Sequence, residues 1–221
     1  VRFTSINSTL AKKEMHDGVH IRIMVTRGIK KTPSQDPRLT ISGPNVVIIA
    51  EYKKASNETK AKGISLFTSS FRRGSPDYLD PKLNCHSKLH EVQALIQAIE
   101  AGADEALMLD VNGFVSTCNA TNFFIVKDGE VWTSTGAYCM NGITRQKVIE
   151  ICAKNKIPCH QKNFSLYDTY GADEAFVTGT FGGLTPVTKI DGKMIENQND
   201  LSLRGNLDRL YEELIANESK P

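Results

Sequence analysis

The chain has 221 residues, of which 40% are hydrophobic and 24% are charged, so it is large enough to bury a substantial core. A formal net charge of +2 argues against a protein that binds nucleic acid or a membrane surface through its overall charge. No apolar run is long enough to cross a bilayer, which predicts a chain without a transmembrane helix.

The first quarter of the sequence predicts one helix and two strands. Residues 1–15 are polar and helical in character, and residues 19–25 alternate apolar and polar side chains as a strand does. Three prolines and a glycine make residues 29–45 an irregular excursion, and residues 46–50 form an apolar run that is typical of a buried strand.

Short strands, hairpin turns and helices alternate through the rest of the sequence. Asn112-Gly113 and Asp128-Gly129 stand between apolar runs, and such dipeptides are the strongest local hairpin signals. We expect strands at 64–71, 105–109, 114–116, 123–126, 131–133, 175–177 and 187–190. We expect helices at 88–101, where Leu89, Val92, Leu95, Ile96 and Ile99 share one face, after Gly142, and from Leu203 to Leu214. Hairpins mixed with helices predict an α+β fold.

A polar segment divides the sequence. Residues 55–63 show no apolar periodicity and are the best candidate for an interdomain linker. We therefore predict a partial N-terminal α/β domain over residues 1–58, a linker over 59–63 and a larger C-terminal domain over 64–221.

Two short segments have the composition of a phosphate site. Gly142-Ile143-Thr144 leads into a helix, whose first turn offers unpaired N–H groups and the positive end of the dipole. Thr178-Gly179-Thr180 follows an apolar strand and suits close backbone approach to an anion. A capped helix and a glycine-rich turn are the alternatives. The sequence lacks the glycine-rich nucleotide-binding motifs, so a nucleotide is not favoured.

The cysteines and histidines predict neither disulfides nor a metal site. Five cysteines, an odd number, match no zinc spacing, and no signal-peptide pattern precedes them, which favours a reduced cytoplasmic protein. His86 and His90 lie four residues apart, but no third ligand is evident.

Several motifs of the C-terminal part resemble one enzyme family. The segments GADEALMLDVNGFVSTCNATNFFIVKDGEVWT, MNGITRQKVIEIC and GADEAFVTGTFGGLTPVTKIDGKMI resemble the class IV (fold-type IV) pyridoxal-phosphate aminotransferases. That family includes branched-chain and D-amino-acid aminotransferases and aminodeoxychorismate lyase. The resemblance covers roughly residues 64–215. It implies an N-terminal α/β sandwich domain, incomplete here, a larger C-terminal pseudo-barrel domain, and a homodimer.

The resemblance also assigns roles to individual residues. The positions that match cofactor-binding residues of the family are Arg73, Ile143, Thr144, Gly179 and Thr180. Arg22 and Arg27 lie on a strand that in relatives contributes to recognition of the substrate carboxylate, and exposed strand charges are the alternative. The chain begins at Val1, and the family's phosphate-pairing arginine is expected in a segment that precedes it.

The lysine that carries the Schiff base in the family has no clean match. Counting without gaps from the flanking motifs ends on Leu83 or Asn84, and neither is a lysine. Lys82 is the nearest lysine and on a strand would share a face with Asn84, so we predict it as the catalytic residue. Lys88, where the family more often has an aromatic or aliphatic residue, and the absence of any catalytic lysine are the alternatives.

Thr117 stands where the family has a glutamate that bonds the pyridine nitrogen and keeps it protonated. A threonine forms hydrogen bonds, but it supplies no negative charge to raise the pKa of that nitrogen. We therefore expect a weaker electron sink at the cofactor ring.

Together these features predict an aminotransferase that uses pyridoxal 5′-phosphate to move an amino group between a small, branched-chain-type amino acid and a 2-oxo acid. A lyase of the same family is one alternative. The other is a degenerate, non-catalytic member that binds cofactor or a partner. It is motivated by the two positions that differ from the family, namely the lysine position without a clean match and Thr117.

Overall fold

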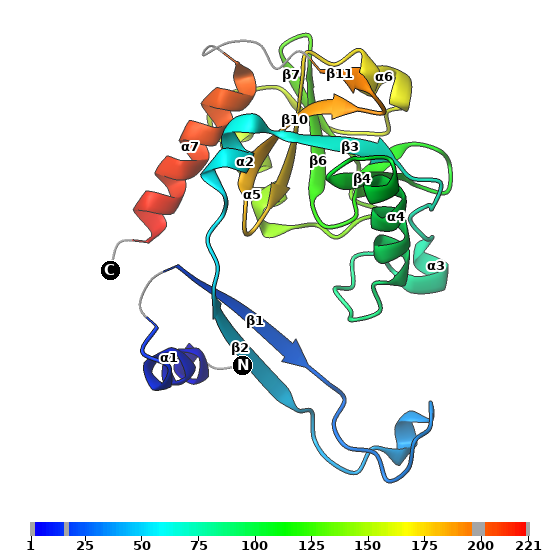
Figure 1. The fold of residues 1–221 in the computed structure, drawn as a ribbon, viewed down its shortest axis with the longest axis vertical. Helices are drawn as coiled ribbons and strands as arrows, with labels where there is room; N and C mark the ends of the chain where they lie inside the picture. The colour runs from blue at the N-terminus through cyan, green and yellow to red at the C-terminus, as the bar shows by residue number, and fades with distance from the viewer. Residues whose placement is uncertain (1–2, 16–17, 196–201, 220–221) are drawn as a thin grey trace. The chain divides into compact units, whose positions relative to one another are not determined.

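The computed structural model describes residues 3–15, 18–195 and 202–219 of the chain. Contacts between Cα atoms divide it into two compact units, Val1–Ala55 and Ser56–Pro221 (Figure 1). The elements of the first unit are helix α1 (Phe3–Lys12), an antiparallel pair of strands, β1 (Val19–Val25) and β2 (Val46–Tyr52), and a short 3-10 helix (Pro37–Leu39). The predicted helix, strands and proline-rich excursion of this region are therefore confirmed. The prediction that residues 46–50 form a buried strand is wrong about burial, because Val46, Val47 and Ile49 are exposed and Ala50 alone of the five is buried.

The segment predicted as a linker, residues 59–63, is mostly helical. Helix α2 (Asn57–Lys62) begins after Ser56, whose side chain accepts a hydrogen bond from the helix's first turn. Lys60 then forms an ion pair with Glu212 of the C-terminal helix at 2.7 Å. This cap and this ion pair, which apolar periodicity does not reveal, explain why the segment belongs to the second unit.

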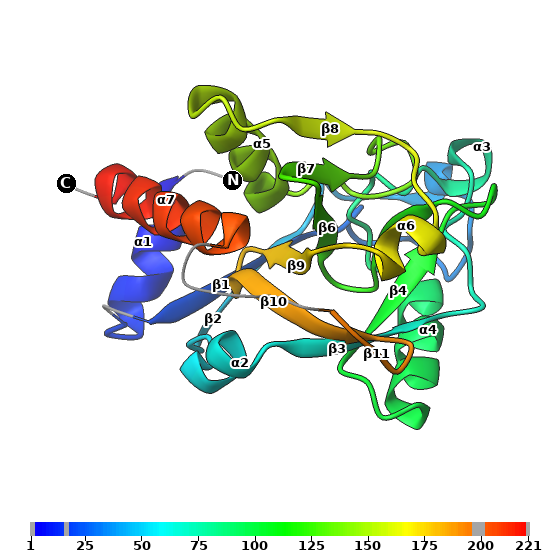
Figure 2. The same ribbon diagram turned by 90° about the horizontal axis from the view of Figure 1, so that it is seen from above.

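The second unit is built on a curled sheet of nine strands (Figure 2). Its strands are β3 (Ile64–Thr68), β4 (Glu105–Leu109), β5 (Val115–Cys118), β6 (Asn122–Lys127), β7 (Glu130–Thr133), β8 (Cys159–Gln161), β9 (Glu174–Gly179), β10 (Gly183–Ile190) and β11 (Lys193–Met194). Their order is β5-β4-β3-β10-β9-β6-β7-β8, with β11 on β10. The β4–β5 and β6–β7 pairs are antiparallel, which confirms both predicted hairpins, whereas β3 pairs parallel with β4 and with β10.

Five further helices surround this sheet, and among the described residues no helix is long and apolar enough to cross a membrane. They are α3 (Pro76–Leu79), α4 (Leu89–Glu100), α5 (Ile143–Lys154), α6 (Leu166–Tyr170) and α7 (Leu203–Glu218). Short elements such as α3, α6 and β8 were not predicted, because they contain too few residues to show a periodic pattern.

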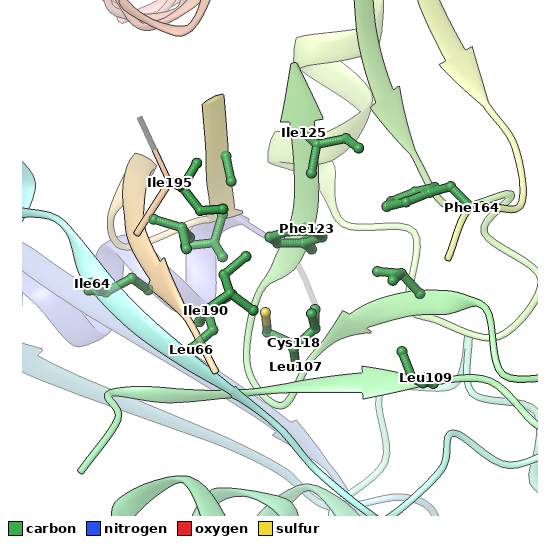
Figure 3. Packing of buried hydrophobic residues seen from close by; sticks show 14 residues of the cluster. Ile64, Leu66, Leu107, Leu109, Cys118, Phe123, Ile125, Phe164, Ile190 and Ile195 are labelled. Atoms are coloured by element: carbon green, nitrogen blue, oxygen red, sulfur yellow. The ribbon is translucent and has the colours of Figure 1, made fainter. Parts of the chain in front are cut away.

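Alternation along the strands builds two cores on opposite faces of the sheet. On β6, Phe123 and Ile125 point into the cluster drawn in Figure 3, among side chains from β3, β4 and β10. Phe124 and Val126 point the other way, into a cluster shared with α5 and α7. Phe124 stacks on Phe176 with ring centroids 4.9 Å apart. The second core therefore fixes the position of α5, whose first turn forms part of the site described below.

Helix α4 packs on the sheet through its small residues. Ala94 and Ala98 are fully buried in a cluster with Ala106 and Met108 of β4. The large apolar residues of α4 lie at the surface of this chain, with exposed fractions of 64% for Leu89, 50% for Val92, 49% for Ile96 and 63% for Ile99. Alanine allows the helix to approach the strand closely, so the apolar stripe seen in the sequence is not the face that α4 buries here.

Candidate functional site

A cavity of about 610 Å³ opens in the second unit, within the usual size of small-molecule sites. Its walls come from the start of α5, the end of β9, the turn between β5 and β6, and the first turns of α4. The residues predicted from sequence that line it are Arg73, Thr117, Ile143, Thr144, Gly179 and Thr180. The fold thus brings together segments that are far apart in the sequence.

The first turn of α5 forms one wall of the cavity. Gly142 is its N-cap residue in extended conformation, and no side chain caps the helix. The N–H of Gly142 donates to Asn122 Oδ1 at 3.3 Å, whereas the N–H groups of the following turn have no acceptor within the helix. A Cβ atom on Gly142 would lie 2.5 Å from Asn122 Oδ1, so glycine allows this close approach. The helix start therefore offers unpaired donors and a positive dipole end to an anion.

The hydroxyl of Thr144 lies 3.4 Å from the hydroxyl of Tyr211 on α7. Both residues are buried. This contact with Tyr211, 67 residues away in the sequence, uses one hydrogen-bonding position of the Thr144 hydroxyl and leaves the others open to a ligand. The backbone N–H of Thr144 remains as a donor of the helix start.

The end of β9 supplies a second group that suits an anion. Thr178 is buried, and its hydroxyl has no hydrogen-bond partner among the described residues. An unsatisfied buried hydroxyl is costly, and a ligand oxygen would satisfy it. Gly179 and Thr180 continue the same wall. Together with the α5 N-terminus, this strand end gives the cavity the chemistry of a phosphate site.

A neutral polar network surrounds Thr117. The Thr117 hydroxyl donates to the carbonyl of Thr121 at 2.8 Å, and the amide of Asn122 donates to Thr117 Oγ1 at 3.4 Å. The same amide donates to the carbonyl of Met140 at 2.9 Å. Asn122 thus ties the Thr117 end of the cavity to the loop before α5. Sequence reasoning missed it, although a polar residue that opens an apolar strand was a visible signal.

Glu105 stands behind this network, where it accepts a hydrogen bond from the Thr121 hydroxyl at 2.7 Å. Burial, and to a lesser degree the charge of Asp104, raises the pKa of the Glu105 carboxyl. Because the folded state holds its proton more tightly than the unfolded chain, stability falls as the pH rises from the unfolded pKa through the folded one.

A Glu105→Gln variant escapes this loss of stability, since its amide oxygen still accepts from Thr121. We expect it to be more stable than the wild type at pH 7, by up to about 1 kcal/mol. Below the unfolded pKa of about 4.3 the difference should vanish. Urea unfolding at several pH values measures it, and a difference that does not change with pH would contradict this assignment.

Arg73 and Glu91 form a buried ion pair in the cavity wall. Arg73 donates to Glu91 Oε1 at 2.6 Å and to the carbonyl of Tyr138 at 3.2 Å. Burial works against ionisation of Glu91, but the hydrogen bond from Arg73 and, more weakly, the charge of Lys88 hold the pKa of that carboxyl below its ordinary value. The charge of Arg73 is therefore already balanced within the chain. Glu91 carried no signal in the sequence beyond being one acidic residue on an amphipathic helix.

The structure separates the two candidate lysines. Residues 80–83 form a turn rather than the expected strand, because the N–H of Leu83 donates to the carbonyl of Asp80. Lys82 and Lys88 are both exposed, but Lys82 pairs with Asp80 at 3.4 Å and is not among the described residues that line the cavity. Asn84 and Lys88 do line it. The role of Lys82 thus loses its geometric argument and stays a prediction.

Arg22 and Arg27 belong to the first unit. Arg22 lies on β1 opposite Ile49 of β2, Arg27 follows the strand, and both arginines are exposed. Their role in substrate recognition stays a prediction.

Comparison with known proteins gives this cavity a context. A family model described as amino-transferase class IV matches residues 3–190. Branched-chain-amino-acid aminotransferase-like protein 2 of Arabidopsis thaliana is 37% identical over 98% of this chain, which spans only 39% of that relative. The putative branched-chain-amino-acid aminotransferase of Methanocaldococcus jannaschii is 37% identical over 87% of this chain and 70% of its own length. The crystal structure of the T.th. branched-chain amino acid aminotransferase with pyridoxamine 5′-phosphate superposes with a TM-score of 0.87 at 27% identity, covering 97% of this chain and 70% of that one.

Proposed function

The chain belongs to the class IV aminotransferase family, and from this we propose that it binds pyridoxal 5′-phosphate and moves an amino group between a small, branched-chain-type amino acid and a 2-oxo acid. The observation that carries the proposal is the cavity, where the uncapped start of α5 meets the buried, unpartnered hydroxyl of Thr178.

The residues at the phosphate end of the cavity fit this cofactor. The N–H groups of Ile143 and Thr144 would donate to the phosphate, as would the Thr178–Thr180 segment, and the helix dipole favours its charge. A Cβ atom on Gly179 would make an ordinary van der Waals contact with Thr121 at 3.4 Å, so glycine is not required there by this neighbour.

The ring end of the cavity is neutral. The bound cofactor supplies an aldehyde for the amino group and a ring that accepts the electrons released at the substrate carbon. Thr117, held by Thr121 and Asn122, would lie against the ring and contribute hydrogen bonding without charge. Arg73, balanced by Glu91, would shape the wall rather than supply a free cation. These residues would bind and orient the cofactor. Because Thr117 is uncharged, the cofactor ring would accept electrons less readily than it would beside a carboxylate.

Replacing Thr178 by valine tests the phosphate end directly. Valine matches the shape of threonine and removes an unsatisfied hydroxyl, so the ligand-free variant should be as stable as the wild type or more stable by about 1 kcal/mol. Loss of a hydrogen bond to a charged phosphate should weaken binding of pyridoxal 5′-phosphate by roughly tenfold or more. Calorimetric titration and urea unfolding measure the two effects.

Thr133 offers the matched control. Its buried hydroxyl donates to the carbonyl of Phe123 at 2.8 Å, away from the cavity wall. Thr133→Val should therefore lose stability, by about 1 kcal/mol, and keep its affinity for the cofactor. If both variants bind pyridoxal 5′-phosphate as the wild type does, the cavity does not hold the phosphate at Thr178.

Two other functions use the same cavity. A lyase of this family would need the same phosphate clamp, and products of bond cleavage would distinguish it. A non-catalytic member is favoured by the threonine at 117 and by Asn84, which lines the cavity where ungapped counting placed the family's lysine. Cofactor binding without amino transfer from valine to 2-oxoglutarate would support that alternative.

The proposal includes a homodimer in the cytoplasm. The exposed apolar residues of α4, such as Val92 and Ile96, would gain from a partner surface, and sedimentation equilibrium measures the assembly. The cytoplasmic location is supported by the cysteines. All five are free, as expected in a reducing compartment.

A further inference from the structure

We propose that Lys88 is the residue that bonds covalently to the aldehyde of the cofactor, in place of a lysine at the position held by Asn84. This inference rests on the proposed function, because it requires pyridoxal 5′-phosphate in the cavity. Among the described residues that line this cavity, Lys88 is the only one whose side chain carries a primary amine.

The backbone of Lys88 is held firmly at the cavity. Lys88 is the N-cap residue of α4, and its carbonyl accepts a hydrogen bond from the N–H of Val92 at 2.9 Å. The helix itself is anchored on β4 by the fully buried Ala94 and Ala98. The side chain thus starts from a fixed point, and its four carbons give the amine the reach to search the cavity.

The amine of Lys88 is free to react. Within the described part of the chain, no hydrogen bond or ion pair engages its Nζ atom, and the acidic residue of the same wall is Glu91, one turn along the same helix. One oxygen of Glu91 is bound to Arg73. The other has no partner among the described residues and remains available to accept a proton or hydrogen bond.

The rival lysine is poorly placed for the same reaction. Lys82 lies on a turn, and its Nζ atom pairs with Asp80 Oδ2 at 3.4 Å outside the cavity wall. To reach the cofactor it would have to break this pair.

The reaction balances without any further reagent. The unprotonated Lys88 nitrogen adds to the aldehyde carbon, the carbon–oxygen double bond opens, and the oxygen leaves as water with two protons that came from the amine. One carbon–nitrogen double bond forms for each water released. Borohydride then reduces that bond to a stable secondary amine, so the attachment is measured without reference to turnover.

The experiment uses the full chain with pyridoxal 5′-phosphate, followed by borohydride and peptide mapping by mass spectrometry. In the wild type we expect one modified peptide, with the label on Lys88. Lys88→Arg should lose this label while Lys82→Arg keeps it. Prior saturation with 4′-deoxypyridoxine 5′-phosphate, which lacks the aldehyde, should block the labelling and so distinguish the cavity from surface lysines. Lys88→Met guards against poor folding of the arginine variant, and circular dichroism checks both.

The outcomes separate this inference from the proposed function. A label on Lys82, or a label that survives in Lys88→Arg and Lys88→Met, overturns the role of Lys88. Binding of the deoxy analogue by the wild type without any blockable label overturns it as well, and leaves cofactor binding intact. If the wild type binds neither compound, the proposed function fails and the role of Lys88 fails with it.

Discussion

An Arg73→Ala variant is expected to lose about 3–5 kcal/mol of its free energy of unfolding. Arg73 and Glu91 are 10% and 15% exposed at their side chains, and their ion pair measures 2.6 Å. Removing the guanidinium leaves the Glu91 carboxylate buried without its counter-ion, and it removes one of the hydrogen bonds to the carbonyl of Tyr138, which the Ser116 hydroxyl still bonds at 3.0 Å. Urea unfolding at pH 7 measures the loss.

The matched test is the double variant Arg73→Ala/Glu91→Ala. Since it no longer buries an uncompensated charge, it should regain part of the stability lost in the single variant, and the coupling energy follows from the double-mutant cycle. A loss below about 1 kcal/mol in Arg73→Ala would mean that the pair is solvated, as exposed pairs are.

A Thr117→Glu variant is expected to transfer amino groups faster than the wild type, by about tenfold or more, which corresponds to about 1.4 kcal/mol at the transition state. A carboxylate beside the pyridine nitrogen raises the pKa of that nitrogen and strengthens the ring as an electron acceptor. The rate of the half-reaction with valine, followed by absorbance after rapid mixing, measures this effect.

Thr117→Gln is the control, because glutamine has the size of glutamate without its charge. Both variants lose the hydrogen bond from Thr117 to the Thr121 carbonyl, at a cost of about 1 kcal/mol in stability. A faster Thr117→Glu beside an unchanged Thr117→Gln assigns the gain to charge. Equal or slower rates in both would place Thr117 away from the pyridine nitrogen.

Local signals predicted the parts of the fold that local chemistry determines. Asp128-Gly129 gives the β6–β7 hairpin, in which Lys127 pairs with Glu130 across the turn, and Gly142 gives the start of α5. β8 was missed because the segment Cys159–Gln161 becomes a strand only by pairing parallel with β7, a contact that no periodicity in three residues records.

In the candidate site, too, residues set by local sequence were predicted, and contacts between distant segments were not. The glycine and hydroxyl residues of the proposed phosphate site are recognisable in sequence, and the fold brings both segments to one cavity. What surrounds them depends on contacts between distant segments, as between Thr144 and Tyr211 or Arg73 and Glu91. The choice between Lys82 and Lys88 turned on whether residues 80–83 form a strand or a turn, and their apolar content is too low to distinguish the two.

The position of β3 also sets when the second unit can finish folding during synthesis. β3 lies between β4 and β10, and Asp191, directly after β10, accepts hydrogen bonds from the N–H and the hydroxyl of Thr68, 123 residues earlier. At about 5–20 residues per second, a ribosome needs roughly 6–25 s to make that stretch. Throughout this interval one edge of β3 is unpaired and open to other chains, so nascent and truncated forms should depend on chaperones far more than the finished protein does.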